Sequence, residues 1–225
     1  MNKIKIKEIF TSIQGEGPYI GYNQLFIRFC NCNLKCNFCD TKFSSNENVM
    51  EFCPNELADY INKNYDMKKV HSISLTGGEP LLSTAFLREF LPLVPAKKYL
   101  ETNATLADKL LEIKPFIDYI CADIKLESAT GIKDTYKFHD KFFEKCKGVE
   151  TFAKIVFDEN ITNEEIEICA NLGKKYDIEL ILQPVMKNDK MSVSSKFIME
   201  IYDKFLSLYP KVRVIPQVHK FIGVE

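Results

Sequence analysis

This sequence lacks long apolar runs, and its net charge is close to zero. No stretch approaches the 18 or so apolar residues that a membrane-spanning helix needs. The 30 basic and 31 acidic residues leave a net charge of −1, which argues against a surface built to coat nucleic acid or to steer toward a membrane. The first residues alternate charge with isoleucine, unlike a signal peptide. We therefore expect a cytoplasmic protein with a small-molecule partner, no nucleic acid and no membrane.

Internal repeats, linkers and low-complexity tracts are also missing. With 225 residues, of which 46% are hydrophobic, the chain is long enough for one sizeable core and short for two. We expect residues 1–225 to form a single domain.

The eight cysteines are unevenly placed. Three of them, Cys32, Cys36 and Cys39, follow an apolar run with the spacing C-x3-C-x2-C, and the other five are scattered at Cys30, Cys53, Cys121, Cys146 and Cys169. Without a signal peptide, reduced thiols are favoured over disulfides. Cys30 ends the strand-like run 25–30, and we interpret it as a packing residue.

The spacing of the three cysteines favours an iron–sulfur cluster over other roles. A structural zinc site needs four ligands, and no second C-x2-C or histidine pair lies at a suitable distance. A [4Fe–4S] cluster held by three thiolates instead leaves one iron free for a small ligand. Two alternatives remain open: the cysteines are ordinary buried side chains, or they hold zinc together with a distant fourth ligand.

From residue 71 onward, strand and helix patterns alternate. Before that point we expect a short edge strand at 4–10, a buried strand at 25–30, an irregular segment at 40–53 and a helix from Pro54 to about Asn62. The later strands are expected at 72–75, 98–100, 119–122, 153–157, 179–182 and 212–215, with helices at 85–93, 106–113, 136–146, 164–176 and 194–208. About six such units predict an α/β fold, a partial (β/α)6 TIM-like parallel barrel.

Polar residues follow several of these strands. They occur in the segments 76–80, 101–103, 123–125 and 183–185, and Lys154 lies within a strand. Because the C-terminal strand ends of such barrels carry the chemistry, we expect these segments to gather at one rim. Each segment taken alone has a simpler explanation, such as a turn at Gly77 and Gly78 or a solvated ion pair between Asp123 and Lys125.

Two motifs together resemble the radical S-adenosylmethionine (SAM) superfamily. One is the cysteine triad, with Phe38 before its last member, and the other is Thr76-Gly77-Gly78-Glu79-Pro80, which looks like the glycine motif that receives the aminoacyl end of SAM. Four further stretches, 12–17, 26–28, 39–41 and 218–223, resemble the 7-carboxy-7-deazaguanine synthase family. The resemblance runs from Lys7 to the last residue and implies a barrel of the radical SAM type.

The family resemblance also implies a reaction and its cofactors. The family converts 6-carboxy-5,6,7,8-tetrahydropterin to 7-carboxy-7-deazaguanine with loss of ammonia, in the biosynthesis of queuosine and other deazapurines. Its cofactors are a [4Fe–4S] cluster, SAM and Mg²⁺. A SAM-derived radical does the chemistry, so no catalytic side chain is implied. The resemblance further implies an electron donor such as flavodoxin or ferredoxin, and a homodimer.

Site residues are carried over position by position. The resemblance assigns the cluster to Cys32, Cys36 and Cys39, and magnesium to Thr41, whose hydroxyl suits a hard cation. It assigns SAM to Gly78, Asp123, Ile124, Lys125, Gln183, Pro184, Val185 and Met186. It assigns the substrate to Ile13, Gln14, Gly15, Arg28, Thr76 and the terminal carboxylate of Glu225. A guanidinium such as that of Arg28 can bind a carboxylate through two hydrogen bonds.

The sequence departs from the family pattern at two places. Ala104 stands where glycine is common, and the segment 123–125 replaces the Ser-Pro-Lys of some relatives. The apolar side chains of Val218, Phe221, Ile222 and Val224 predict that the C-terminal segment docks onto the protein. Two other functions stay open: a glycyl-radical-activating enzyme, which acts on a protein, and a zinc-binding interaction module without catalysis.

Overall fold

The computed structural model describes residues 3–37, 39, 49–187 and 190–224. Within these ranges the main feature is a nine-stranded sheet with the order β11-β8-β7-β6-β5-β4-β2-β1-β3. Its strands are β1 (Ile4–Ile13), β2 (Asn23–Phe29), β3 (Met50–Phe52), β4 (Ser72–Gly77), β5 (Lys97–Thr102), β6 (Tyr119–Ile124), β7 (Glu150–Phe157), β8 (Glu179–Pro184) and β11 (Val212–Val214).

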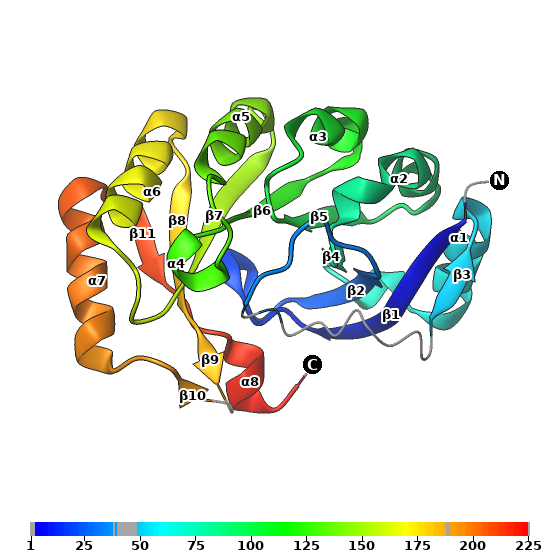
Figure 1. The fold of residues 1–225 in the computed structure, drawn as a ribbon. Helices are drawn as coiled ribbons and strands as arrows, with labels where there is room; N and C mark the ends of the chain where they lie inside the picture. Colours follow the sequence, from blue (N-terminus) through cyan, green and yellow to red (C-terminus); the bar gives the residue numbers. More distant parts are fainter. Residues whose placement is uncertain (1–2, 38, 40–48, 188–189, 225) are drawn as a thin grey trace.

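Seven strands of this sheet run parallel, from β2 through β11, while β1 and β3 are antiparallel to their neighbours. Figure 1 shows the sheet as an open arc with a row of helices along its outer side. The helices of this row are α1 (Pro54–Asn64), α2 (Thr84–Phe90), α3 (Ala107–Ile113), α5 (Tyr136–Cys146), α6 (Asn163–Tyr176) and α7 (Ser195–Leu208). The predicted α/β class and partial (β/α)6 barrel are confirmed.

Local sequence signals explain where several helices begin. Pro54 occupies the first turn of α1, where its missing N–H costs nothing. Thr162 caps α6 in a reciprocal capping box with Glu165. The Ser194 side chain accepts from the Phe197 N–H at the start of α7. These starts agree with the sequence predictions to within one residue.

The hydrophobic core fills the space between the sheet and the outer helices. Leu25, Ile27, Leu75 and Leu100 come from neighbouring strands and are fully buried in it. A smaller cluster of Tyr99, Tyr119, Cys121, Phe152 and Ile181 packs separately. Tyr19, in the 3-10 turn Gly17–Tyr19, packs against this second cluster. Among the described residues, no helix has both the length and the apolar character that crossing a bilayer requires.

The structure corrects three local expectations. The first strand, β1, extends to Ile13 rather than to residue 10. It lies between β2 and β3, so β3 and not β1 is the edge strand of the sheet. The segment expected to be irregular contains β3, which pairs with Ile4–Ile6. The short elements that were not expected include α4 (Glu127–Thr130) and the hairpin strands β9 (Met186–Lys187) and β10 (Lys190–Met191). Elements this short carry too few residues for a periodic signal.

The C-terminal segment forms α8 (Val218–Ile222), which Figure 1 shows near β9 and away from the row of outer helices. It contacts the loop that follows β1, because the Val218 N–H donates to the Gly15 carbonyl at 2.9 Å. Phe221 and Ile222, however, are 53% and 51% exposed. The expectation that apolar burial docks this segment is therefore wrong for these two side chains.

Candidate functional site

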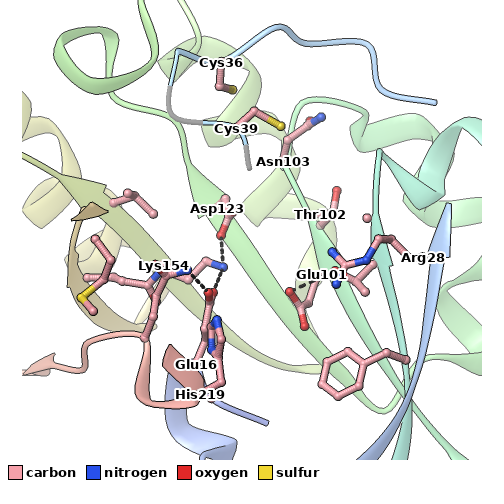
Figure 2. A pocket seen from close by; sticks show the side chains of 18 of the residues that line it. Glu16, Arg28, Cys36, Cys39, Glu101, Thr102, Asn103, Asp123, Lys154 and His219 are labelled. Atoms are coloured by element: carbon pink, nitrogen blue, oxygen red, sulfur yellow. Dashed lines mark hydrogen bonds and ion pairs between the residues drawn. The ribbon is translucent and has the colours of Figure 1, made fainter. Parts of the chain in front are cut away.

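A cavity of about 290 Å³ lies where the parallel strands end. The ends of β4, β5, β6 and β8 all contribute residues to it, as predicted for the polar segments that follow these strands. The predicted site residues that line it are Ile13, Gln14, Gly15, Arg28, Cys32, Cys36, Cys39, Thr76, Gly78, Asp123, Lys125, Gln183, Pro184, Val185 and Met186. Figure 2 shows 18 of the side chains around the cavity.

Of the predicted site residues that the structure describes, Ile124 does not line the cavity. The Ile124 side chain is 1% exposed and belongs to the hydrophobic core. Thr41 and Glu225 lie outside the described residues, as does Phe38 of the cysteine motif.

The cysteine loop is held by main-chain contacts to two other loops. The Asn37 N–H donates to the carbonyl of Thr130, at the end of α4, and the Glu79 N–H donates to the Asn31 carbonyl. Gly78 packs so closely that a Cβ atom there would come within 1.9 Å of the Asn31 oxygen. The second glycine of the motif is therefore needed for the contact between the two loops.

The three cysteines all line the cavity, and Cys36 and Cys39 are labelled at its upper side in Figure 2. Burial raises the pKa of Cys32 and of Cys36, and the positive charge of Lys125 opposes the shift at Cys36. In the part of the chain that the structure describes, no three His, Cys, Asp or Glu side chains are already gathered as a metal site. A shared ligand would therefore require these side chains to turn toward it.

A row of alternating charges crosses the cavity. Lys125 pairs with Asp123 at 2.7 Å, Lys154 contacts Asp123 at 3.3 Å, and Lys154 also pairs with Glu16. Asp123 on β6 and Lys154 on β7 are direct neighbours in the strand register. Figure 2 shows the Asp123–Lys154–Glu16 part of this row. The Asp123–Lys154 contact is thus a consequence of sheet pairing. The Asp123–Lys125 pair, whose side chains are 18% and 11% exposed, is more buried than the solvated pair that was the simpler alternative.

The electrostatics of Glu16 and Lys154 follow from this pairing. Burial alone would raise the pKa of Glu16, but the charge and hydrogen bond of Lys154 lower it to about 2. Burial alone would lower the pKa of Lys154, but Asp123 and Glu16 raise it well above its usual value. Both groups are therefore charged at neutral pH.

A further carboxylate, that of Glu101, lies near the end of β5. Its oxygens accept hydrogen bonds from Ser74 at 3.0 Å, from Thr76 at 3.3 Å and from the Gln14 amide at 3.2 Å. Burial raises the pKa of Glu101. The same Gln14 amide donates to Gln24 at 2.9 Å. A buried polar network therefore ties the loop after β1 to β2, β4 and β5, and Gln14, Thr76 and Glu101 of this network line the cavity.

Arg28 lies beside Thr76, because β2 and β4 pair in that register. Its Nε atom contacts Glu8 at 2.7 Å, and the guanidinium lies 5.7 Å from the centre of the Phe10 ring. Both Arg28 and Phe10 line the cavity. The Glu8 contact is an ion pair in which Nε has no hydrogen-bond partner among the described residues, so the guanidinium donors can serve a bound anion.

Glu79 connects two rim loops. It is 1% exposed and accepts hydrogen bonds from the Leu81 N–H, the Thr102 hydroxyl and the Asn103 N–H. Burial raises the pKa of Glu79 to about 7.

Ala104, the residue after Asn103, has a φ of 56°, a left-handed conformation that glycine adopts more easily. This conformation explains why a glycine would suit the position where the sequence departs from the family pattern.

Sequence reasoning named no role for several residues that the structure brings into the site. Glu16, Glu101 and His219 lay within segments that the sequence singled out, 12–17, 101–103 and 218–223, but no role was assigned to them. Gln217 had no comparable signal. Gln217 donates to Glu16 at 2.7 Å, and a Cβ atom at Gly15 would come within 2.3 Å of the His219 Nδ1 atom.

Comparisons with known proteins find a matching family model and relatives of similar length. Residues 13–125 match the family model described as a 4Fe-4S single cluster domain. A protein of Archaeoglobus fulgidus named 7-carboxy-7-deazaguanine synthase is 38% identical, with 97% of each chain covered. A protein of the same name from Geobacter sulfurreducens is 34% identical, again with 97% of each chain covered.

Two solved structures share the fold. The crystal structure of QueE from Escherichia coli has a TM-score of 0.63 at 17% identity and covers 96% of this chain and 95% of its own. The crystal structure of a radical SAM methyltransferase from Sphaerobacter thermophilus has a TM-score of 0.65 at 12% identity and covers 96% of this chain and 76% of its own. At these identities the two structures support the fold alone.

Proposed function

Because the chain belongs to the 7-carboxy-7-deazaguanine synthase family, we propose that it converts 6-carboxy-5,6,7,8-tetrahydropterin to 7-carboxy-7-deazaguanine with loss of ammonia. The reaction would depend on a [4Fe–4S] cluster, SAM and Mg²⁺, and would take place in the cytoplasm. The observation that carries the proposal is one cavity lined by the three cysteines, the Thr76–Gly78 segment, Gln14 and Arg28 together.

The three cysteines that line the cavity fit a cluster held by three thiolates. Cys32, Cys36 and Cys39 come from a single loop, and thiolates are the ligands that iron–sulfur clusters use. When bound, the cluster supplies the electron that splits SAM into methionine and a 5′-deoxyadenosyl radical. The nearby positive charge of Lys125 favours the thiolate form of Cys36, which is the form that binds iron.

The SAM site is proposed on the neighbouring wall, at Gly78, Asp123–Lys125 and Gln183–Met186. Gln183 supports this assignment, because it is 3% exposed and its Oε1 atom has no hydrogen-bond partner among the described residues. A buried acceptor without a partner is costly, and a hydroxyl or amino group of a ligand in the cavity would satisfy it. For Ile124 the side chain is in the core, so its contribution is limited to the main chain.

The pterin site is proposed at Ile13, Gln14, Gly15, Arg28 and Thr76. Arg28 would bind the substrate carboxylate through two charge-assisted hydrogen bonds. Glu101 orients both Gln14 and Thr76, because both donate to it. The chain's role in this part of the cavity is to fix the ring of the substrate in place and to keep water away from a reactive carbon radical.

Three further parts of the proposal involve features outside the described residues. We assign Mg²⁺ to Thr41, a substrate contact to the terminal carboxylate of Glu225, and electron delivery to a protein such as flavodoxin or ferredoxin. The family resemblance also favours a homodimer.

The test is anaerobic incubation of the purified protein with SAM, a reductant, Mg²⁺ and 6-carboxy-5,6,7,8-tetrahydropterin, followed by mass spectrometry. We expect 7-carboxy-7-deazaguanine, ammonia and 5′-deoxyadenosine, with less product when Mg²⁺ is omitted. Cluster-loaded protein that cleaves SAM but leaves the pterin intact would contradict the substrate assignment and favour a glycyl-radical-activating enzyme. Colourless protein that contains zinc and does not cleave SAM would favour the interaction module.

A further inference from the structure

Asn103 makes a side-chain contact with the cysteine loop that the proposed function does not use. Its Nδ2 atom lies 3.9 Å from the Cys32 sulfur and 2.8 Å from the Asn33 Oδ1 atom. A side-chain amide carries two N–H groups, so both contacts can be made at once. Figure 2 shows Asn103 on the same side of the cavity as Cys36 and Cys39, away from Glu16 and His219.

The surrounding hydrogen bonds fix which end of the amide faces the sulfur. The Thr105 N–H and hydroxyl both donate to the Asn103 Oδ1 atom, at 3.1 and 2.6 Å. Because these two donors require an oxygen, the NH₂ group is the end that faces Cys32. The Asn103 main-chain N–H is bound to Glu79 at 2.8 Å, and the residue is only 6% exposed. The donor is therefore held in place before any ligand binds.

From this geometry we infer that Asn103 is a positioning residue that donates an N–H to the Cys32 sulfur and thereby raises the reduction potential of the cluster. The inference rests on the proposed function, because it requires Cys32 to be a cluster ligand. Reduction of [4Fe–4S]²⁺ to [4Fe–4S]⁺ by one electron from the reductant adds negative charge, part of which is carried by the cysteine sulfurs. A donor aimed at such a sulfur stabilises the reduced form more than the oxidised form.

Asn103 is the donor to Cys32 that a substitution can remove. The Leu34 main-chain N–H also contacts the Cys32 sulfur, at 3.4 Å, and it remains in every side-chain variant. Asn33 offers a matched control. Its truncation removes the other acceptor of the Asn103 amide and the Asn33 amide donor to the Thr105 hydroxyl at 3.0 Å. The contact from Asn103 to Cys32 and the Thr105 main-chain N–H bond to Asn103 do not involve the Asn33 side chain.

The experiment is a redox titration of anaerobically purified, cluster-loaded protein, followed by the electron paramagnetic resonance (EPR) signal of the reduced cluster. We expect Asn103→Ala to reduce the equilibrium constant for cluster reduction about tenfold, which corresponds to about 59 mV for one electron. Asn33→Ala should leave the potential unchanged. An Asn103→Ala protein with full iron content and the wild-type potential would overturn the inference.

A second measurement uses the wild-type chain and covers the case in which Asn103→Ala does not retain iron. Pulsed EPR of the reduced cluster in protein made with side-chain ¹⁵N-labelled asparagine should show a ¹⁵N coupling that persists in Asn33→Ala. Absence of that coupling would also overturn the inference. Wild-type protein that binds no cluster at all would instead contradict the proposed function, so the two failures are distinguishable.

Discussion

Two cysteines only two residues apart, Cys30 and Cys32, have different surroundings. Cys32 lines the cavity with Cys36 and Cys39, whereas Cys30 is half-buried at the end of β2 and is not part of the cavity wall. This difference favours Cys32, Cys36 and Cys39 over Cys30 as the candidate cluster ligands.

We predict that Cys36→Ala abolishes both cluster binding and SAM cleavage, because two thiolates cannot retain the cluster. Cys30→Ala should keep the iron content and the cleavage rate of the wild type. The measurements are iron and sulfide content, visible absorption and 5′-deoxyadenosine formation. Loss of iron in Cys30→Ala, with retention in Cys36→Ala, would show that the ligand assignment is wrong.

His139 is a buried group whose protonation should affect stability. Its Nε2 atom accepts from the Lys125 N–H at 3.0 Å, so its Nδ1 atom carries the proton and donates to the Ala104 carbonyl at 3.2 Å. The neutral ring thus joins the loops that follow β5 and β6. Burial lowers the pKa of His139 to about 4, from an ordinary value of 6.5.

A group with a lowered pKa contributes stability that is fully present above pH 6.5 and is lost as the pH falls through 4. We predict that wild type loses about 3 kcal/mol of unfolding free energy relative to His139→Gln between pH 6.5 and 4, since glutamine can keep both hydrogen bonds without charging. Chemical unfolding at several pH values measures the difference. Glu79 has a pKa raised to about 7, so its contribution to stability is lost as the pH rises. Wild type and His139→Gln both contain Glu79, so this contribution cancels in the comparison. Parallel stability profiles would contradict the prediction.

At the scale of elements, α8 is held to the site by polar and main-chain contacts. The Val218 N–H donates to the Gly15 carbonyl, and Gln217 donates to Glu16. Gly15 leaves no room for a side chain, because a Cβ atom would come within 2.6 Å of the His219 main-chain nitrogen. The position of α8 therefore depends on Gly15, which lies about 200 residues earlier in the chain.

We predict that Gly15→Ala displaces α8, speeds hydrogen exchange at the Val218 amide and raises KM for the pterin about tenfold, equivalent to about 1.4 kcal/mol of binding free energy. Gly21→Ala is the control. A Cβ atom there meets nothing within 4 Å, so it can cost stability through its φ of 91° but should leave KM unchanged. A wild-type KM in Gly15→Ala would mean that α8 does not shape the substrate site.

The end of the chain gives a related prediction. If the terminal carboxylate binds the pterin, adding a few glycines after Glu225 should raise KM for the pterin, because the carboxylate moves away from the amino-pyrimidine edge of the ring. SAM cleavage without the pterin should stay the same. Unaltered pterin kinetics in the extended protein would show that the chain end plays no part in binding.

Sequence signals predicted the long elements better than the short ones. Helix α5 was predicted with the same bounds that the structure shows, because eleven residues carry a clear helical period. The two-residue strands β9 and β10 have no period to detect. For α8 the apolar content suggested burial, but main-chain hydrogen bonds hold it and Phe221 stays exposed. Tertiary contacts of that kind leave no local pattern.

At the scale of the whole molecule, the site is assembled from residues far apart in the chain. Lys154 pairs with Glu16 across 138 positions, and Gln217 reaches Glu16 across 201. The barrel topology predicted which strand ends would meet, so the rim segments could be placed from the sequence. The partner of each charged side chain could not, because it depends on strand register, as for Asp123 beside Lys154.

The central claim is that one cavity holds SAM and the pterin together, each on its own set of residues. The direct measurement is equilibrium binding of SAM and of 6-carboxy-5,6,7,8-tetrahydropterin to cluster-loaded wild type and Arg28→Met, under anaerobic conditions. Loss of a charge-assisted contact costs about 1.5–3 kcal/mol, so Arg28→Met should bind the pterin at least about tenfold more weakly with SAM affinity unchanged. Unchanged pterin affinity, or an equal loss for both ligands, would contradict the account.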